Sequence, residues 1–314
     1  MNRIATQTNA LETKLDTITT SIGSGLSTKV DRINNNMMIP ITAAGTISTA
    51  GSYILANDIA GNITVSGSDI SIDFNQYKIT GQLIITAGVS RLDFYNGIIE
   101  SSSGPCVAIS TATDKRFVAL DNLVLRMKDT STSAINLPSG SFGDNFWIKN
   151  CIIIGSSQAS SGHQGIDYAF GDTEGRTTIE NCIITNFFIG VRIQVNSPTP
   201  VTMRNCLVME CGTAISVSIN GQYQIITNNL LKDNGAGISL AIGVTRSFVF
   251  GNVITGCTST SAGAVISNSG GSTNQIYGNF AYNNAGAVGT RYSGVSAVLT
   301  SVAGDTSMYA NISL

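Results

Sequence analysis

Stretches of alternating apolar and polar residues recur along the chain, and each ends in an asparagine followed by an apolar run. The clearest examples are FWIKNCIIIGSS (from Phe146), TTIENCIITNFFIGVRI (177–193) and VTMRNCLVMECGTAISVSI (from Val201). A second phrase follows most runs, as in SAINL, QGIDY, IGVRI, TAISV, AGISL and GAVIS. Alternation with a period of two predicts short β-strands with one buried face.

The recurring asparagines set the period of the repeat. They are Asn96, Asn122, Asn150, Asn181, Asn205, Asn228, Asn252 and Asn279, at steps of 26, 28, 31, 24, 23, 24 and 27 residues. Periods of about 20–50 residues are typical of stacked repeats. Because each repeat holds strands and no helical pattern, we predict an all-β, single-stranded solenoid, a parallel β-helix of about 8–10 coils. Each asparagine is expected at a turn, with positive φ, hydrogen-bonded to its equivalent one coil away.

The residues before these asparagines support one stacking register. Two positions earlier stand apolar residues, which are Phe94, Leu120, Ile148, Ile179, Met203, Ile226 and Phe250. One position earlier stand Asp121, Lys149, Glu180, Arg204, Thr227, Gly251 and Gly278. The charges in the second set alternate in sign, and opposite charges on adjacent strands attract by roughly 0.2–1 kcal/mol per pair. We expect the first set to point inward and the second outward.

The chain has six cysteines, and Cys151, Cys182 and Cys206 directly follow repeat asparagines. A chain of this length needs no disulfide framework, and unpaired cysteine packs as a small apolar side chain. We therefore expect buried free thiols, with these three stacked on neighbouring coils.

Over roughly residues 60 to 290, the repeat resembles the right-handed parallel β-helix superfamily of pectate lyases, polygalacturonases and phage tailspikes. The stretch ISIDFNQYKITG, at 70–81, is similar to the opening coil phrase of that superfamily. The resemblance implies the fold, and it leaves the activity open because one fold carries many functions.

Three parts are expected along the chain: 1–38, 39–290 as the β-helix, and 291–314 as a C-terminal cap or contact segment. The first part carries an apolar stripe near heptad spacing, formed by Ile4, Leu11, Leu15, Ile18, Ile22, Leu26, Val30 and Ile33. This spacing predicts an α-helical segment and favours a trimeric coiled coil. A single cap helix or a loose tail remains the alternative, since glycines in SIGSG weaken a helix.

Composition excludes several classes of function. Charged residues make up 11% of the chain and the net charge is −2, with no Lys/Arg cluster, so we expect no nucleic-acid partner. No apolar run reaches 18 residues, which argues against membrane insertion. The opening MNRIATQTNA has no apolar core, so we expect no signal peptide and synthesis in the cytoplasm.

Ionisable groups concentrate between residues 143 and 192, namely Asp144, His163, Asp167, Asp172, Glu174, Arg176 and Arg192. GHQG and VRIQ are similar to the Gly-His-Gly and Arg-Ile-Lys motifs of polygalacturonases. However, no Asn-Thr-Asp or Asp-Asp motif precedes His163, and Gln194 stands where that family has lysine. Asp167, Arg192 and His163 are the remaining catalytic candidates, although a lone histidine in a Gly/Ser loop is usually solvated.

The second strand phrase places Asn136, Asp167, Arg192, Ser216 and Ser239 in one outward column. Asp167 and Arg192 would lie roughly 5 Å apart on adjacent coils, where a salt bridge is the simplest interpretation. With Asn136 and Tyr168, they form the candidate sugar-binding site. Calcium needs six to eight oxygen ligands, and Asp167, Asp172 and Glu174 lack the grouping for it. We expect no metal and no cofactor.

These observations favour a structural or adhesive fibre or spike protein of a virus or phage particle. It would be a homotrimer with a rigid β-helix shaft, displayed on the particle surface and able to bind glycans. The alternative is a polysaccharide lyase or glycoside hydrolase of the β-helix type. A cytosolic scaffold without a glycan ligand is a third interpretation.

Overall fold

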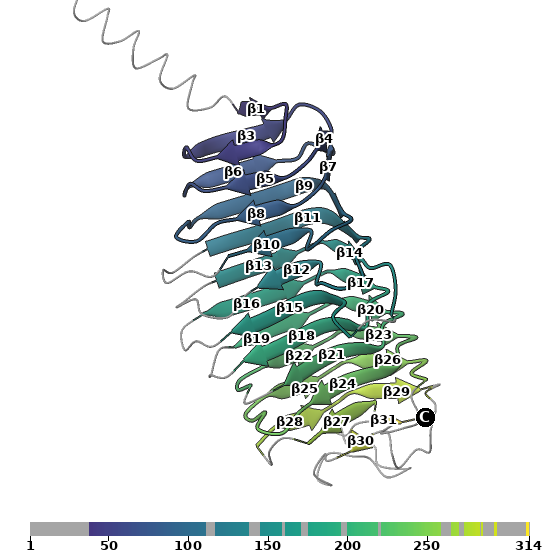
Figure 1. Cartoon of the computed structure of the whole chain (residues 1–314). Helices are drawn as coiled ribbons and strands as arrows, with labels where there is room; N and C mark the ends of the chain where they lie inside the picture. The colour runs from purple at the N-terminus through teal and green to yellow at the C-terminus, as the bar shows by residue number, and fades with distance from the viewer. Residues whose placement is uncertain are drawn as a thin grey trace, which may run out of the picture. The chain divides into compact units, whose positions relative to one another are not determined.

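The computed structural model describes residues 38–110, 117–137, 145–158, 161–170, 175–195, 200–218, 221–258, 265–269, 273–282, 284, 292–293 and 312–313. The chain divides into two compact units, Met1–Ile39 and Pro40–Leu314. The helix and coiled coil predicted over 1–38 lie outside the described residues, apart from Met38. The described strands form parallel stacks, which confirms the predicted parallel β-helix (Figure 1).

Two stacks of strands belong to one 20-stranded sheet. The first strand of each coil is β3 (Gly51–Leu55), β6 (Ile70–Asp73), β9 (Leu92–Ser101), β11 (Phe117–Met127), β13 (Asn145–Lys149), β16 (Arg176–Glu180), β19 (Val201–Arg204), β22 (Ile225–Thr227), β25 (Phe248–Phe250) or β28 (Gln275–Tyr277). The second strand is β4 (Ile59–Ala60), β7 (Lys78–Thr80), β14 (Ile152–Ile154), β17 (Ile183–Thr185), β20 (Leu207–Met209), β23 (Leu230–Lys232), β26 (Val253–Thr255), β29 (Phe280–Tyr282) or β31 (Ile312–Ser313). The long strands β9 and β11 run through the corner and serve both stacks.

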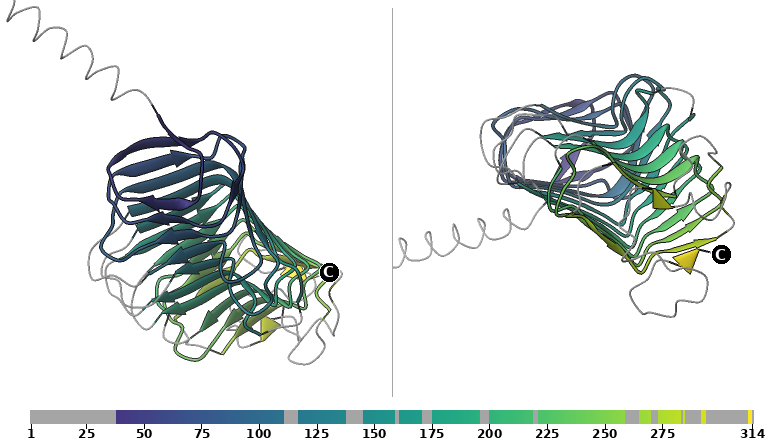
Figure 2. Two further views of the ribbon diagram at one scale, coloured as in Figure 1. Left: turned by 45° about the horizontal axis from the view of Figure 1, so that its top comes forward. Right: turned by 90° about the horizontal axis from the view of Figure 1, so that it is seen from below.

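The third strands form a separate 11-stranded sheet that closes each coil (Figure 2). They are β2 (Gly45–Ile47), β5 (Ile63–Val65), β8 (Leu83–Ile85), β10 (Val107–Ile109), β12 (Ile135–Leu137), β15 (Gln164–Phe170), β18 (Ile189–Val195), β21 (Thr213–Ser218), β24 (Ala236–Leu240), β27 (Ile266–Asn268) and β30 (Tyr292–Ser293). β1 (Ile39–Ile41) pairs with β3 and begins the stack of first strands. The expected cap at 291–314 contains β30 and β31, which extend the two sheets by one strand each.

Side chains at equivalent positions stack into continuous columns. The inward column of the first strands is Phe94, Leu120, Ile148, Ile179, Met203, Ile226, Val249 and Ile276, all at most 2% exposed. The predicted column agrees as far as Ile226 and then differs. Phe250 points outward, where its ring stacks on Tyr277 at 5.4 Å between centroids.

The corner between first and second strands needs a residue with positive φ in every coil. Asn96, Asn122, Asn150, Asn181, Asn205 and Asn228 occupy it with φ between 50° and 65°, followed by Gly251 and Gly278. Asparagine and glycine adopt this geometry at the lowest cost. Hydrogen bonds join neighbouring coils, for example from Asn122 Nδ2 to Asn96 Oδ1 at 2.9 Å.

Two expected members of this corner column, Asn252 and Asn279, lie one position further on. Asn229, Asn252 and Asn279 are buried and continue the inward column that contains Cys151, Cys182 and Cys206. The predicted step from Asn228 to Asn252 is therefore one residue too long. The pair Asn228-Asn229 supplies one asparagine to each column, and Asn252 aligns with Asn229 instead of Asn228. We call the six residues Cys151, Cys182, Cys206, Asn229, Asn252 and Asn279 the thiol–amide column.

The structure has six free, buried cysteines, as expected. The expected outward charge column is also found in the aligned part of the repeat, where Glu180 and Arg204 form an ion pair at 3.0 Å. Thr227, Phe250 and Tyr277 continue it, in place of the expected Gly251 and Gly278.

Candidate functional site

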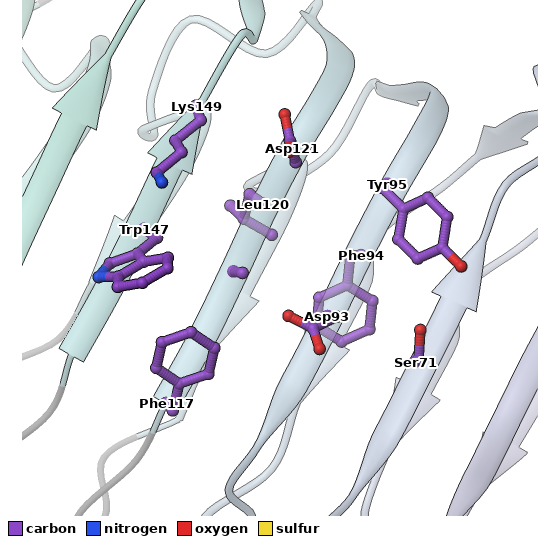
Figure 3. A pocket seen from close by; sticks show the side chains of 10 residues that line it. Ser71, Asp93, Phe94, Tyr95, Phe117, Leu120, Asp121, Trp147 and Lys149 are labelled. Carbon is purple, nitrogen blue, oxygen red and sulfur yellow. The ribbon is translucent and has the colours of Figure 1, made fainter.

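A groove of about 340 Å³ on the first-strand face crosses β6, β9, β11 and β13 (Figure 3). Its lining residues are Ser71, Asp93, Phe94, Tyr95, Phe117, Ala119, Leu120, Asp121, Trp147 and Lys149. We call it the Trp147 groove. It is separate from the polar ladder that the sequence suggested as a binding site.

The groove exists because a small side chain stands between large ones. Asp93, Ala119 and Trp147 are directly opposite one another on successive coils and point outward. Coils repeat at about 4.8 Å, so the methyl group of Ala119 leaves a space that neighbouring side chains do not fill. Phe94 and Leu120 are buried beneath this floor.

One wall of the groove is aromatic. Trp147 is 43% exposed, and it is the only tryptophan in the chain. Phe117 meets the indole edge-on, with centroids 5.0 Å apart and an interplanar angle of 76°. Lys149 Nζ lies 4.2 Å from the centroid of the indole ring, a cation–π contact. These two neighbours hold the indole in place while leaving part of it open to solvent.

Two carboxylates also line the groove, Asp93 across Ala119 from Trp147 and Asp121 directly opposite Lys149. Asp93 and Asp121 lie on adjacent strands two residues apart in register, which puts their Cα atoms roughly 8 Å apart. Desolvation raises the pKa of the Asp93 carboxyl above its ordinary value. Asn150 Nδ2 donates to Asp121 Oδ1 at 2.7 Å and fixes that carboxylate. The groove thus offers an apolar platform together with hydrogen-bond acceptors and one ammonium donor.

A second groove, of about 410 Å³, follows further along the same face. Its lining is Arg176, Thr177, Thr178, Pro200, Thr202, Tyr223, Ile225 and Phe248, with no carboxylate among them. Thr178, Thr202, Ile225 and Phe248 continue the outward column that contains Trp147. Tyr223 is held by Arg246, whose Nη1 donates to the phenol oxygen at 2.7 Å.

The predicted polar ladder is present on the third-strand face. Asn136, Asp167 and Arg192 are directly opposite one another, and Ser216 and Ser239 continue the column. Arg192 donates from Nε and Nη2 to the two carboxylate oxygens of Asp167 at 2.8 and 2.6 Å. These hydrogen bonds raise the pKa of the Arg192 guanidinium. Both charged groups of this pair therefore already have partners within the protein.

Tyr168 and His163 lie in the interior, so neither offers its side chain to a ligand at the surface. Both are 0% exposed. The expectation of a solvated histidine differs from the structure, because the ring packs against Phe187 with centroids 4.7 Å apart. His163 Nδ1 lies 2.5 Å from the carbonyl oxygen of Ser157 and donates to it. Among the described residues, Nε2 has no hydrogen-bonding partner.

The remaining members of the expected ionisable cluster, Asp144, Asp172 and Glu174, lie outside the described residues. Within the described ranges, no group of three or more His, Cys, Asp or Glu side chains could hold a metal ion. The same part of the chain contains no helix long and apolar enough to cross a membrane.

Sequence reasoning missed the Trp147 groove although its signal was present. In the phrase FWIK, Phe146 and Ile148 are buried while Trp147 and Lys149 alternate with them and point outward. A tryptophan at an outward strand position departs from the polar pattern of a solvated face. Aligning this phrase with FVALD would have placed Ala119 beside it.

Comparison with known proteins supports the fold and leaves the groove unassigned. The family model described as a right-handed β-helix region matches residues 82–245 and 127–281. No curated protein and no solved structure matches the chain. Since the matched residues cover more than half of the sequence, the chain belongs to the family of proteins with a right-handed β-helix region.

Proposed function

We propose that this protein is a structural or adhesive shaft that binds a surface glycan in the Trp147 groove. The observation that carries the proposal is the exposed indole of Trp147 beside a hollow with two carboxylates. A sugar ring has an apolar face that packs on an aromatic side chain, and its hydroxyl groups donate to carboxylates. Asp93, Asp121 and Lys149 supply these polar partners around the indole.

The rest of the molecule fits a rigid support for such a site. The strands pair in register along the described β-helix, and hydrogen-bonded asparagines at its corners link neighbouring coils. We propose a fibre or spike on a virus or phage particle, assembled as a homotrimer through residues 1–38. The heptad-like pattern of that segment is the argument for the trimer.

Fluorescence provides a direct test of glycan binding, because Trp147 is the only tryptophan. Titrating the full chain with a panel of neutral and acidic oligosaccharides should change the emission with a saturable curve for at least one glycan. Ala119→Phe fills the groove and keeps the fluorophore, so it should abolish the response. Ala108→Phe makes the same exchange in the outward column of the third-strand face and should leave the response intact.

Two results would contradict the glycan proposal. One is a flat emission across the panel, and the other is equal binding by the Ala119→Phe and Ala108→Phe proteins. Substituting Arg192 and Asp167 should not change binding at the groove. A loss of binding in those variants would point to the polar ladder on the third-strand face instead.

A polysaccharide hydrolase is the second candidate, and it rests on Asp93 and Asp121. Inverting glycosidases pair a carboxylic acid of raised pKa with a carboxylate base, and in this groove desolvation raises the pKa of the Asp93 carboxyl. Incubating the bound glycan with the protein and measuring new reducing ends distinguishes the two functions. Product release that disappears in Asp93→Asn would favour the enzyme, whereas unchanged glycan would favour the adhesive shaft.

The trimer has its own test by light scattering. The full chain should give a mass near three times 32.8 kDa, and a chain without residues 1–38 should give a lower mass. A mass of 32.8 kDa for both would remove the coiled-coil argument and leave the groove proposal unaffected.

A further inference from the structure

An apolar stripe runs along the outward side of the second strands. It begins at Ile98 on β9, continues through Val124 on β11 and reaches Phe280 on β29, with one apolar residue from each coil. Its middle consists of Ile152, Ile183, Leu207 and Leu230, which are directly opposite one another. Figure 1 shows β14, β17, β20, β23, β26 and β29 following one another along this side.

The stripe departs from the rule for a solvated sheet face, where outward positions are polar. On the third-strand face the equivalent column is Asn136, Asp167, Arg192, Ser216, Ser239 and Ser267. In the stripe, Ile152 is 36% exposed and Leu230 is 39% exposed. One protein thus presents a polar column on one face and an unbroken apolar column on another.

We infer that the apolar stripe is the contact between copies of this chain along the shaft. This inference deepens the proposed oligomeric fibre, and it rests on a different surface from the predicted coiled coil. A parallel coiled coil at residues 1–38 would bring copies side by side in the same direction. Copies related by a symmetry axis parallel to the direction in which the coils stack present identical stripes to one another, and each apolar side chain meets its equivalent.

The size of the stripe fits the centre of such an interface. Seven coil spacings of about 4.8 Å give a length of roughly 34 Å, and the stripe together with the neighbouring, more polar column gives a width of roughly 13 Å. The resulting patch of roughly 450 Å² is about half of what each partner buries in a standard interface. Apolar centres with polar rims are typical of such contacts.

Charges mark the edges of the stripe. Lys78 stands opposite Ile98 and ends the column at its N-terminal side. The neighbouring outward column carries Glu100 and Arg126 on adjacent coils, and Lys232 further along. Lys128 forms an ion pair with Glu100 at 2.5 Å. The apolar surface is therefore bounded by charged residues, as expected for the rim of an interface.

Cysteine cross-linking tests this contact in the full chain. All six native cysteines are buried, so a new thiol at Leu230→Cys is the reactive one. Mild oxidation should convert a large fraction of this variant into a covalent dimer. Ile242→Cys is the matched control, because Ile242 is 79% exposed and lies off the stripe, and this variant should stay monomeric on a denaturing gel.

Charge substitution gives a second readout. Ile152→Asp with Leu230→Asp should lower the mass in light scattering towards 32.8 kDa, or make the assembly dissociate at a several-fold higher concentration. Ile242→Asp should match the unmodified protein. A multimer that neither forms the Leu230→Cys cross-link nor responds to the aspartates would overturn the inference.

A monomeric chain would also overturn it, and maleimide labelling then identifies the occupant. Protection of Leu230→Cys in a monomer would mean that another segment of the same chain covers the stripe. The Trp147 titration is performed on the same variants and separates the two proposals. Retained glycan response without a cross-link rejects only the stripe contact, while a cross-link without a glycan response rejects only the groove.

Discussion

The thiol–amide column fills one position of the coil with two different chemical groups. In the coils of Cys151, Cys182 and Cys206 a thiol points inward, whereas in the coils of Asn229, Asn252 and Asn279 an amide does. Both face the same set of backbone carbonyls. Cys182 Sγ lies 3.5 Å from Ile148 O, and Asn252 Nδ2 lies 2.9 Å from Ile226 O, the equivalent atom further along the stack.

The amide differs from the thiol because its oxygen also accepts hydrogen bonds from the neighbouring coil. Asn252 Oδ1 receives hydrogen bonds from the backbone N–H and the side-chain amide of Asn229, both at 3.0 Å. Asn279 Oδ1 accepts from Asn252 in the same way. A thiol is a weak donor and a weak acceptor, so it packs at this position without linking the coils as strongly. Size and shape therefore allow either a thiol or an amide at this inward position, while hydrogen bonding sets how tightly neighbouring coils are joined.

Alkaline pH should have the largest effect, and it acts on buried thiols but not on amides, as two thiols outside the thiol–amide column, Cys106 and Cys257, allow us to test. Burial raises the pKa of Cys106 from 9.0 to about 12, and that of Cys257 also to about 12. Between these values the unfolded chain loses the protons while the folded chain keeps them, so stability is full below pH 9 and falls as the pH rises. Each thiol contributes about 1.4 kcal/mol per pH unit in that window.

The measurement is the melting temperature by circular dichroism from pH 8 to about pH 10.5. A variant with Cys106→Ala and Cys257→Ala should show a shallower decline than the unmodified protein, because amides and methyl groups do not titrate. Equal slopes for the two proteins would contradict the assignment of the decline to buried thiols.

Asn252→Leu should be the most damaging single substitution in the column. It leaves the carbonyl of Ile226 and the N–H of Asn229 without their partners in a buried position, at a cost of about 3–5 kcal/mol. Denaturant unfolding measures this loss. Asn136→Leu, the same exchange at an outward position, should change stability by less than about 1 kcal/mol. Similar losses for both variants would reject the buried ladder.

Cys182→Ala should cost less, about 1–2 kcal/mol, because it removes one buried sulfur and long hydrogen bonds. The same unfolding experiment ranks it against Asn252→Leu. A larger loss for Cys182→Ala would reverse the comparison and make packing, not hydrogen bonding, the stronger link between coils.

Asn205→Gly should have the smallest effect, within about 1 kcal/mol, because Gly251 and Gly278 already occupy the same corner with positive φ. Asn205→Val should lower the unfolding free energy more, by about 1–2 kcal/mol, since a β-branched residue resists this geometry. If valine were tolerated as well as glycine, positive φ would not be what selects asparagine at the corner.

The fold was predictable because the strand periodicity and the corner geometry each require particular residue types at regular positions in the sequence. Alternation identified the buried positions as far as Ile226, and the asparagines as far as Asn228 marked the positive-φ corner. The prediction failed at Asn228-Asn229 for a chemical reason. Asparagine suits both a left-handed turn and a buried hydrogen-bonding column, so its identity alone does not say which of the two it occupies.

The candidate site was predictable only in part. The register of the repeat predicted that Asp167 and Arg192 lie directly opposite each other on adjacent strands, and the structure confirms this pairing. The burial of Tyr168 and His163 depends on the direction of each side chain, and that of His163 depends on a loop that the repeat does not specify. Predicting the Trp147 groove would have required aligning three coils, because the groove forms where the small side chain of Ala119 lies between Asp93 and Trp147.

The equal steps of the later coils have a consequence for length. Thr202, Ile225 and Phe248 follow one another at 23-residue intervals in unbroken register. Deleting or duplicating one such interval would shorten or extend the rod by about 4.8 Å without turning any face. The length of the β-helix can therefore change in steps of one coil while the Trp147 groove stays unchanged.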